Sequence, residues 1–413
     1  MKKSAIAVAV AAALGTSAVA MAETTLYGSA RVSVDWTNPD MSDFANLNYR
    51  SNSNGGFETI NTNKYLQVWN NSSRLGVRGS EDLGSGISAI YQYEFGVNVT
   101  GQNDGPGSSE YFNSNRPRWV GLKGDFGALT LGTQFTPYYN VIGYTDTFNS
   151  TKTFNRDYFL SGSSTMGNPV FFQKGIAELR RGSSVLYTTP NWSGLSAQGM
   201  VTMNGRPGAN FVDTWEANLT YSNGPWFAGA TYLQDRNRSY GPYDVSDPLA
   251  GDYLNWHSHD NQYGAAVGWD NKQFGVGFSW QQYNPDDKVK ADTILACVPP
   301  VCDPGIIAGQ AYERVNAYTL QGTYYFGSEV LRLTGSYMKP SNADTKLYTV
   351  EAGFQHNLSK RTRLWLEYIY NKQKFDNYNT IVGVDANDNF VFQEQNGDDS
   401  NMHTVSAGIR HDF

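Results

Sequence analysis

The strongest constraint on the fold of this chain is a one-by-one alternation of apolar and polar residues that recurs along its length. In residues 24–36, Leu26, Val32 and Val34 share one face, while Ser29 and Arg31 lie on the other. A period of two is the pattern of a β-strand with one apolar and one polar face. After residue 22, no apolar run approaches the ~18 residues that a membrane-spanning helix requires. We therefore expect strands with two chemically different faces.

The same alternation continues to the last residue. Val405, Ala407 and Ile409 alternate with polar residues, and the chain stops on the aromatic Phe413 in mid-strand. Sixteen such segments can be counted, and an even number is typical of single-chain bacterial barrels. They lie near 24–36, 65–80, 86–98, 115–124, 127–136, 183–190, 194–203, 213–222, 225–235, 260–270, 272–283, 313–325, 329–339, 345–357, 361–372 and 402–413.

The composition favours a membrane barrel over a soluble sandwich. The chain holds 42 Gly, 27 Tyr, 21 Phe and 10 Trp, but only 40% of its residues are apolar. Along the apolar faces, aromatic residues stand at the strand ends and small residues in the middle. That order suits a lipid-facing band between two aromatic girdles, and a polar lumen lowers the overall hydropathy. The predicted fold is all-β: a transmembrane antiparallel up-and-down β-barrel.

The connections between the segments alternate in length. Short ones such as Asn223-Gly224 and Asp270-Asn271 are tight-turn signals. Long polar ones occupy 37–64, 99–114, 137–182, 236–259, 284–312 and 373–401. Short periplasmic turns and long outer loops are the asymmetry of outer-membrane barrels. Because a lipid-exposed sheet cannot keep an open edge, we expect the strand that ends at Phe413 to pair with residues 24–36.

The N-terminus predicts export. Lys2 and Lys3 precede an apolar stretch, small residues and the A-x-A site Ala20-Met21-Ala22, which is the pattern of a secretory signal peptide. We expect residues 1–22 to be removed and residues 23–413 to form the barrel in the bacterial outer membrane. In that oxidising setting, Cys297 and Cys302 are expected to form a small disulfide ring in an outer loop.

The charge balance excludes a nucleic-acid partner. The chain carries 31 basic and 38 acidic residues, a balance of −7, and removal of Lys2 and Lys3 leaves 29 against 38, or −9. No basic stripe that could follow a phosphate backbone is present. No metal site or cofactor motif is expected either, because the nearest imitation, Asp385 to Asn389, lacks the glycine and the distal glutamate of a calcium-binding loop.

Several stretches resemble the Gram-negative general porin family. They are Leu26-Tyr27-Gly28, residues 73–84 (SRLGVRGSEDLG), residues 120–127 (VGLKGDFG), residues 181–187 (RGSSVLY) and the terminal residues 408–413 (GIRHDF). The resemblance implies a sixteen-stranded, water-filled channel that passes ions and small hydrophilic solutes through the lipid of the outer membrane, usually as a homotrimer. It also implies that the third long connection, residues 137–182 (hereafter L3), folds inward and narrows the pore.

The family's narrow zone carries a ladder of basic wall residues opposite acids. By motif, Arg74, Arg116 and Arg181 match ladder positions in this chain. Where the family often has a basic residue after Leu-Tyr-Gly, this chain has Ser29, with Arg31 two residues further on the same face. Glu94, Asp146 and Asp157 are the candidate acids. The acidic Pro-Glu-Phe-Gly-Gly stretch of enterobacterial relatives is absent.

The residues themselves predict the same lumenal arginines. Arg31, Arg74, Arg78, Arg332 and Arg363 alternate with apolar residues on predicted strands. A charge on the lipid face costs ~2–4 kcal/mol at the bilayer midplane, so these side chains should point into the lumen. There they would either shape a constriction or only solvate the wall. The arginines favour anions, whereas acidic outer loops and the overall balance of −9 favour cations. The sequence does not settle the net sign, and the overall balance leans toward cations.

Other functions remain as alternatives. An enzyme is disfavoured because the five histidines stand in no nucleophile-and-base motif. A substrate-specific channel for a sugar, a nucleoside or phosphate would suit the aromatic residues of L3, among them Tyr138, Tyr144 and Phe148. Those side chains could equally pack the loop against the wall. A structural role would require a plugged barrel, and L3 shows no globular plug.

Overall fold

The computed structural model describes residues 23–40, 49–51, 57–59, 64–101, 112–113, 116–148, 179–203, 205, 211–236, 259–284, 314–341, 346–374, 378–384, 390–395 and 400–413. The expected signal peptide, Asp157, Cys297 and Cys302 lie outside these residues. Within them, no helix is long and apolar enough to cross a membrane.

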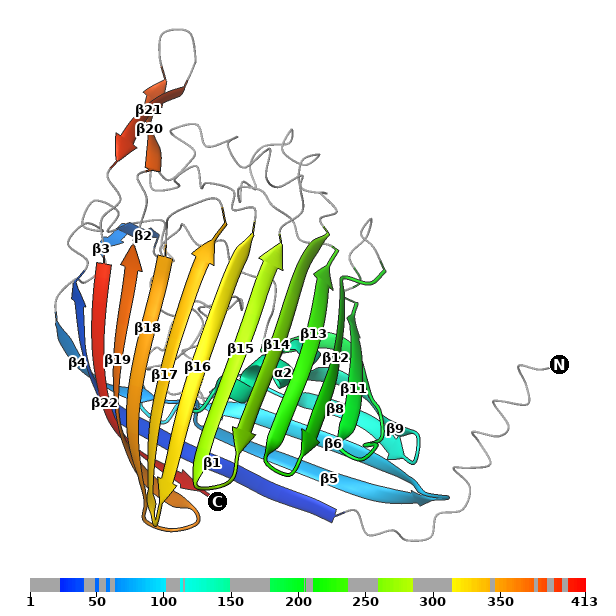
Figure 1. Cartoon of the computed structure of the whole chain (residues 1–413). Coiled ribbons are helices and arrows are strands. Elements are labelled where there is room, and N and C mark those ends of the chain that lie inside the picture. The colour runs from blue at the N-terminus through cyan, green and yellow to red at the C-terminus, as the bar shows by residue number, and fades with distance from the viewer. Residues whose placement is uncertain are drawn as a thin grey trace.

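The strands of the main sheet form one closed antiparallel barrel with sixteen strand positions, each called a stave here (Figure 1). Two staves are interrupted, so each of them consists of two labelled strands. In chain order the staves are β1 (Glu23–Asp40), β4 (Tyr65–Asn70) with β5 (Arg74–Gly84), β6 (Ile87–Val97), β7 (Phe112–Asn113) with β8 (Arg118–Gly124), β9 (Gly127–Phe135), β10 (Arg180–Thr188), β11 (Leu195–Thr202), β12 (Thr214–Asn223), β13 (Trp226–Asp235), β14 (Asp260–Asp270), β15 (Phe274–Asn284), β16 (Val315–Phe326), β17 (Glu329–Pro340), β18 (Lys346–Asn357), β19 (Thr362–Lys374) and β22 (Ser400–Asp412). The predicted barrel and its strand number are confirmed.

The remaining elements lie in the long connections. Two small hairpins, β2 (Tyr49–Ser51) with β3 (Phe57–Thr59) and β20 (Tyr378–Val384) with β21 (Phe390–Gln395), pair outside the barrel sheet. L3 begins with the short helix α2 (Pro137–Ile142) and the 3-10 turn η2 (Gly143–Thr145). Figure 1 shows the short turns gathered at one end of the barrel and the β20–β21 hairpin standing beyond the other end.

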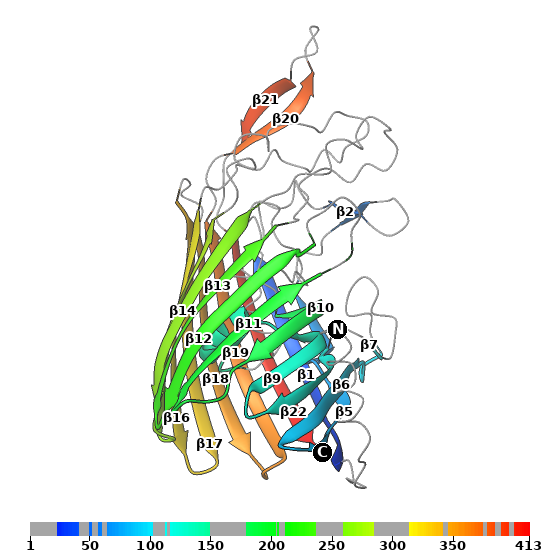
Figure 2. The same cartoon turned by 90° about the vertical axis from the view of Figure 1, so that its right-hand side faces the viewer.

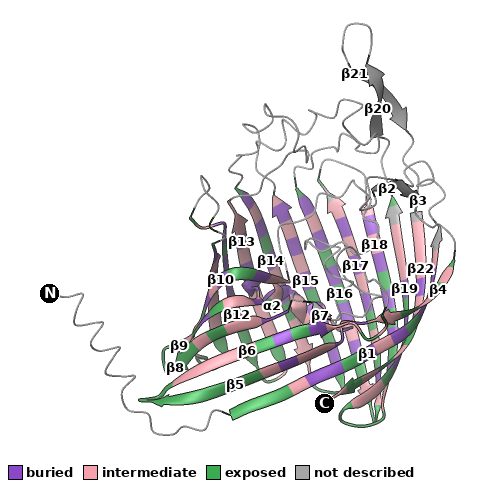
Figure 3. Cartoon of the chain, turned by 180° about the vertical axis from the view of Figure 1, so that it is seen from behind, coloured by how far each residue is buried: buried purple, intermediate pink, exposed green. Residues whose placement is uncertain are grey.

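Burial along the strands is the reverse of that in a soluble protein. The outward faces expose large apolar side chains, for example Leu26 (64%), Leu66 (68%) and Leu320 (58%). The inward faces bury polar side chains such as Thr319, Thr334 and Ser406. Figure 3 shows the resulting alternation of buried and exposed positions along the strands. This arrangement places the predicted apolar faces on the lipid side and the polar faces in the lumen.

The barrel closes where the two ends of the sequence meet. β1 pairs with β22 from Ser29↔Asp412 to Asp40↔Asn401. Beyond the Ser29↔Asp412 pair, the Gly28 amide donates to the Phe413 carbonyl (3.0 Å) and the Phe413 amide donates to the Gly28 carbonyl (3.1 Å). A Cβ atom at Gly28 would stand 2.5 Å from the Phe413 ring, so only glycine leaves room for that ring at the seam.

Candidate functional site in the barrel lumen

The first part of L3 lies inside the barrel. The Thr136 hydroxyl accepts from the Tyr139 amide (3.1 Å) and Pro137 occupies the first helical position, which together start α2 directly after β9. The Thr136 amide donates to the Leu179 carbonyl (3.3 Å), so the two described ends of L3 stay joined at the wall. α2 then contacts the inner faces of β11 to β15 (Figures 1 and 3).

Polar wall residues hold the start of α2. Glu216 of β12 has no exposed side-chain surface, pairs with Arg181 of β10 (Nε–Oε1, 2.8 Å) and accepts weakly from the Tyr138 amide (3.4 Å). The Tyr138 hydroxyl donates to the Tyr263 carbonyl (3.1 Å) and accepts from Gln262 (3.0 Å). Burial raises the pKa of Tyr138, so this hydroxyl stays neutral and keeps its role as a donor.

Glycines on the wall leave space for the apolar side chains of L3. Ile142 packs at Gly264, and a Cβ atom at Gly268 would fall 1.9 Å from the Tyr144 ring. Tyr144 also stacks on Phe227 of β13 with ring centroids 4.2 Å apart. Further along, a Cβ atom at Gly353 of β18 would meet Phe148 at 2.4 Å. The described part of L3 therefore follows the inner wall from β11 to β18, as expected for aromatic residues that pack the loop against the wall.

Across the barrel, five guanidinium groups gather on the wall formed by β1, the β5–β8 side, β19 and β22. The arginine cluster is defined here as Arg31, Arg74, Arg116, Arg363 and Arg410, with the carboxylates of Glu94 and Asp412. Register brings three of them into one row, because Arg31 is opposite Arg410 on β22 and Arg410 is opposite Arg363 on β19.

A break in the second stave positions Arg74. Three residues, Asn71 to Ser73, separate β4 from β5, and Ser72 adopts a positive φ of 63°. The Arg31 amide donates to the Ser73 hydroxyl (2.9 Å), which in turn donates to the Arg31 carbonyl (3.2 Å). Irregular residues of this kind redirect a strand next to a functional site. The break sets Arg74 opposite Ser29, which is two residues from Arg31 on the same face of β1.

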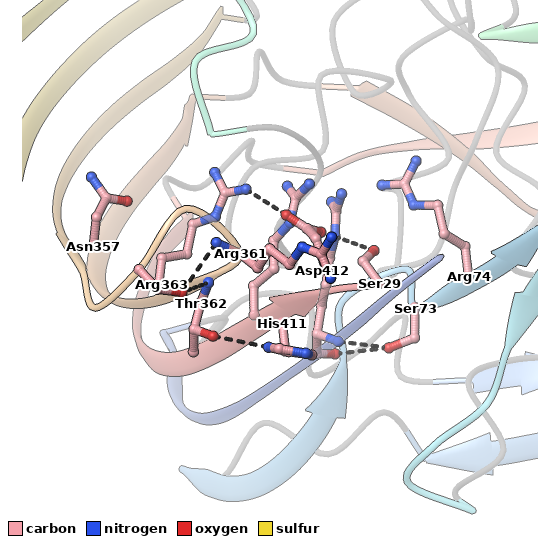
Figure 4. Close-up of polar contacts among 12 residues, drawn as sticks. Ser29, Ser73, Arg74, Asn357, Arg361, Thr362, Arg363, His411 and Asp412 are labelled. Carbon is pink, nitrogen blue, oxygen red and sulfur yellow. Dashed lines mark hydrogen bonds and ion pairs between the residues drawn. The ribbon is translucent and has the colours of Figure 1, made fainter. Parts of the chain in front are cut away.

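Each of the two carboxylates in the cluster pairs with two of its arginines. Glu94 lies 3.3 Å from Arg116 and 3.8 Å from Arg74, and it accepts from the Tyr27 hydroxyl (3.0 Å). Asp412 accepts from Arg363 (2.8 Å) (Figure 4) and from Arg410 (2.7 Å). Five cations and two anions leave a net charge of +3. Like charges on directly opposite residues repel, so this row favours a counter-anion from the lumen.

The predicted site residues fall into separate groups. Arg31, Arg74, Arg116 and Glu94 meet in the arginine cluster, although Arg31 and Arg116 are only 5% and 7% exposed. The other predicted residues lie elsewhere: Arg181 under α2, Arg78 over the Tyr27 ring at 5.1 Å, and Asp146 in L3, where it accepts from the Tyr139 hydroxyl (3.1 Å).

Sequence reasoning did not select Arg410, Asp412 or Glu216 as site residues. All three stand on the polar face of an alternating segment, so the signal for a lumenal position was present. Their importance depends on strand register, since Arg410 acquires its arginine neighbours only when β22 pairs with both β1 and β19. Arg363 was assigned to the lumen from the same alternation but not to the site.

Comparison with known proteins identifies the family. The family model for Gram-negative porins matches residues 7–377. The major outer membrane protein P.IB of Neisseria gonorrhoeae is 26% identical over 376 residues, which cover 88% of this chain and 91% of that protein. Outer membrane porin protein 32 of Delftia acidovorans is 26% identical over 420 residues and matches over the full length of both chains.

Solved structures agree with the fold. The anion-selective porin from Comamonas acidovorans superposes with a TM-score of 0.61 at 21% identity, covering 95% of this chain and all of that one. OmpF of Salmonella typhi, in complex with daunomycin, gives 0.57 at 14% identity over 94% of this chain and 97% of that one. The closed barrel, its polar lumen and the family match together show that the chain belongs to the Gram-negative porins and forms a general diffusion channel in the bacterial outer membrane.

Proposed function

We propose that the arginine cluster and L3 form the constriction of this channel, and that the constriction prefers small anions. The observation that carries the proposal is the row of Arg31, Arg410 and Arg363, which register places on adjacent strands of one wall. Arg74, Arg363 and Arg410 keep 19%, 28% and 18% of their side-chain surface exposed, so these three present charge to the lumen.

The two sides of the proposed constriction differ in charge. The arginine cluster carries +3, whereas the first part of L3, residues 137–148, contributes the single carboxylate Asp146 and no basic residue. A basic wall that faces an acidic or neutral wall creates a field across the path, which orients dipolar solutes and separates ions. Solutes then pass by diffusion with weak binding at several points and without a chemical step.

The two cluster carboxylates limit the anion preference. Glu94 and Asp412 each bind two guanidinium groups, which holds the arginine side chains in place and offsets part of their charge. The Debye length is ~8 Å at physiological ionic strength, so the field is partly screened within the path. We therefore expect a moderate preference that weakens as salt rises, and not exclusion of cations.

Measurement of ion selectivity in a planar bilayer tests the proposal. In a tenfold gradient of potassium chloride, the purified folded protein should give steady, ohmic channels with a reversal potential of the sign for chloride. Substitution of Arg74 and Arg410 by glutamine should move that potential toward cations. A cation-selective reversal potential in the unsubstituted protein, or no response to the two substitutions, would contradict the proposed role of the cluster.

We also propose that three copies associate through the wall formed by β5, β6, β8 and β9. Figure 2 shows that these strands lie low on one side of the barrel. Arg118 of β8 is opposite Tyr93 and Thr133, on the outward face. A guanidinium exposed to lipid near mid-membrane costs roughly 2–4 kcal/mol, and a neighbouring copy would remove that cost. The molecular mass of the folded protein in detergent tests this: a value three times that of one chain is expected, and a single-chain mass would contradict it.

We also propose that residues 1–22 are removed during export, since β1 begins at Glu23, directly after the expected cleavage site. N-terminal sequencing of protein taken from outer membranes should start at Glu23.

A further inference from the structure

The lumenal wall at β1, β22 and β19 carries its charges at two separate levels. The level nearer the short turns is the arginine row, in which Arg410 is opposite Arg363. Two inward positions further toward the long loops, Glu367 of β19 is opposite Ser406 of β22, and Ser406 is opposite Asp35 of β1. Both of these carboxylate side chains are buried. A basic level and an acidic level therefore follow each other along the same wall.

The buried side chain of Trp365 lies between these two levels. It is the inward residue of β19 between Arg363 and Glu367, and it is opposite Gly408 of β22. A Cβ atom at Gly408 would stand 2.1 Å from the tryptophan ring, so the ring covers that glycine. The indole Nε1 lies 3.5 Å from the Ser406 hydroxyl. A large apolar ring thus fills the space that separates the arginines from the carboxylates.

The charged side chains on either side of the ring extend away from it. Arg363 and Arg410 both pair with Asp412, which lies one inward position nearer the short turns than Arg410. The stem of Glu367 turns sideways to β18, where its Cγ atom lies 3.3 Å from the position of a Cβ atom at Gly353. The two guanidinium groups are therefore directed toward one end of the barrel, and the carboxylate stays beside the next strand.

Without the ring, the two levels would be close enough to join. Arg363 and Glu367 are four residues apart on one face of a strand, about 13 Å between their Cα atoms, which two extended side chains bridge through an ion pair. A carboxylate has several acceptor positions on its two oxygens, so Glu367 can accept a guanidinium in addition to the contacts that it already makes. Such a pair would cancel one positive charge of the arginine row.

From this arrangement we infer that Trp365 is a positioning residue, which keeps the arginine row from pairing with Glu367 and so preserves the positive charge at the constriction. The inference rests on the proposed function, because a charge lost from the row matters only if the row selects ions. Arg363 and Arg410 keep 28% and 18% of their side-chain surface exposed, so the charge that the ring protects faces the lumen. Trp365 itself acts only through these arginines.

The reversal potential of the purified folded protein in a gradient of potassium chloride tests this role. Trp365→Ala should lower the permeability of chloride relative to potassium roughly threefold or more, the effect of one unit charge about 6 Å from the ion. Trp365→Phe keeps an apolar ring at the position and should retain the native value.

A glycine substitution displaces the ring without removing it. Gly408→Ala should reproduce the loss of selectivity, because its Cβ atom takes space that the Trp365 ring fills. It also carries the test if Trp365→Ala does not fold. The matched control is Gly335→Ala on β17, where a Cβ atom meets nothing within 4 Å, and it should leave the reversal potential unchanged.

A second substitution identifies the carboxylate. Glu367→Gln in the Trp365→Ala background removes the new acceptor and should restore the native selectivity, and its effect there should exceed its effect in the presence of the tryptophan. Trp365→Ala/Glu351→Gln is the control. Glu351 is opposite Ile369, one inward position further from the arginine row than Glu367, so removal of its equal charge should restore less.

Two outcomes would overturn the inference and leave the proposed constriction standing. The first is an anion-selective native protein whose reversal potential changes in neither Trp365→Ala nor Gly408→Ala. The second is an equal effect of Glu367→Gln with and without the tryptophan, which would mean that the ring does not keep this carboxylate from the arginines. A cation-selective native protein would instead contradict the proposed function, and this inference with it.

Discussion

Glu94 shows how one buried side chain can adjust the field in the lumen. It is 4% exposed, it lies beside both Arg74 and Arg116, and Tyr27 donates to it. The carboxylate thus fixes two guanidinium groups and cancels one of their charges. At the residue scale, the selectivity of the channel depends on how many arginines in the cluster are offset in this way.

Replacement of Glu94 by glutamine should increase the preference for anions. Glutamine keeps the size of the side chain and can still bond to Tyr27, but it removes one negative charge. A unit charge about 6 Å from an ion in water contributes about 0.7 kcal/mol, which corresponds to roughly a threefold change in permeability for each ion. The reversal potential in a salt gradient measures this shift.

Glu351→Gln serves as the control for that substitution. Glu351 is a fully buried, inward-facing carboxylate of β18, outside the arginine cluster. Its removal changes the total charge of the lumen equally and should shift the reversal potential less. An equal shift in both variants would mean that the overall charge, and not the position of Glu94, sets the selectivity.

At the scale of the secondary-structure elements, close packing of its side chains against the wall holds L3 in place, as its hydrogen bonds do. Gly264 and Gly268 of β14 and Gly353 of β18 each leave space for a side chain of the loop. Because strand side chains alternate in direction, only inward positions can do this, and each of these three glycines is inward. The wall and the loop therefore fit each other residue by residue.

Gly268→Ala should displace L3 without disrupting the barrel. The added Cβ atom would fall 1.9 Å from the Tyr144 ring and would break its stacking on Phe227. We expect altered conductance and larger current fluctuations in a planar bilayer. Gly322→Ala on β16 is the matched control, since a Cβ atom there meets nothing within 4 Å. Unchanged channels in Gly268→Ala would show that Tyr144 does not hold the loop.

At the scale of the whole molecule, the pairing of the first and last strands closes the barrel. The seam between β1 and β22 joins residues 361 to 383 positions apart in the sequence, and it also sets the row of Arg31, Arg410 and Arg363. The last residue takes part in that seam through its backbone and its ring. The terminal strand therefore determines both the stability of the barrel and the composition of the candidate site.

Phe413→Ala should destabilise the folded barrel. The ring is 50% exposed, so its removal loses about half of the 1.5–3 kcal/mol expected for a fully buried apolar side chain, or roughly 1 kcal/mol. The midpoint of urea unfolding in detergent measures the loss. Phe326→Ala, at the end of β16 and 38% exposed, tests a similar ring away from the seam. Burial alone predicts a slightly larger loss at Phe326, the more buried ring, so a role in closure should raise the loss at Phe413 above that at Phe326. A loss at Phe413 no larger than that at Phe326 would contradict a special role for the closing strand.

The sequence by itself determined the strands, their two faces and the class of barrel. Alternation is a local property, because successive side chains of a strand must point to opposite sides, and lipid on one side and water on the other select its phase. It therefore assigned Arg31, Arg74 and Arg363 to the lumen side. The same pattern held Arg410 and Glu216 without indicating which residues they would meet.

Only the tertiary structure decided which lumenal residues became neighbours. The stagger between strands, the break at residues 71–73 and the closure of β22 on β1 are non-local, and no single segment encodes them. They bring Arg31, Arg410 and Arg363 into one row and separate Arg181 from it, although all four looked alike as charged residues on polar faces. The position of α2 against five strands is likewise a property of the closed barrel, since its binding surface exists only after those strands have paired.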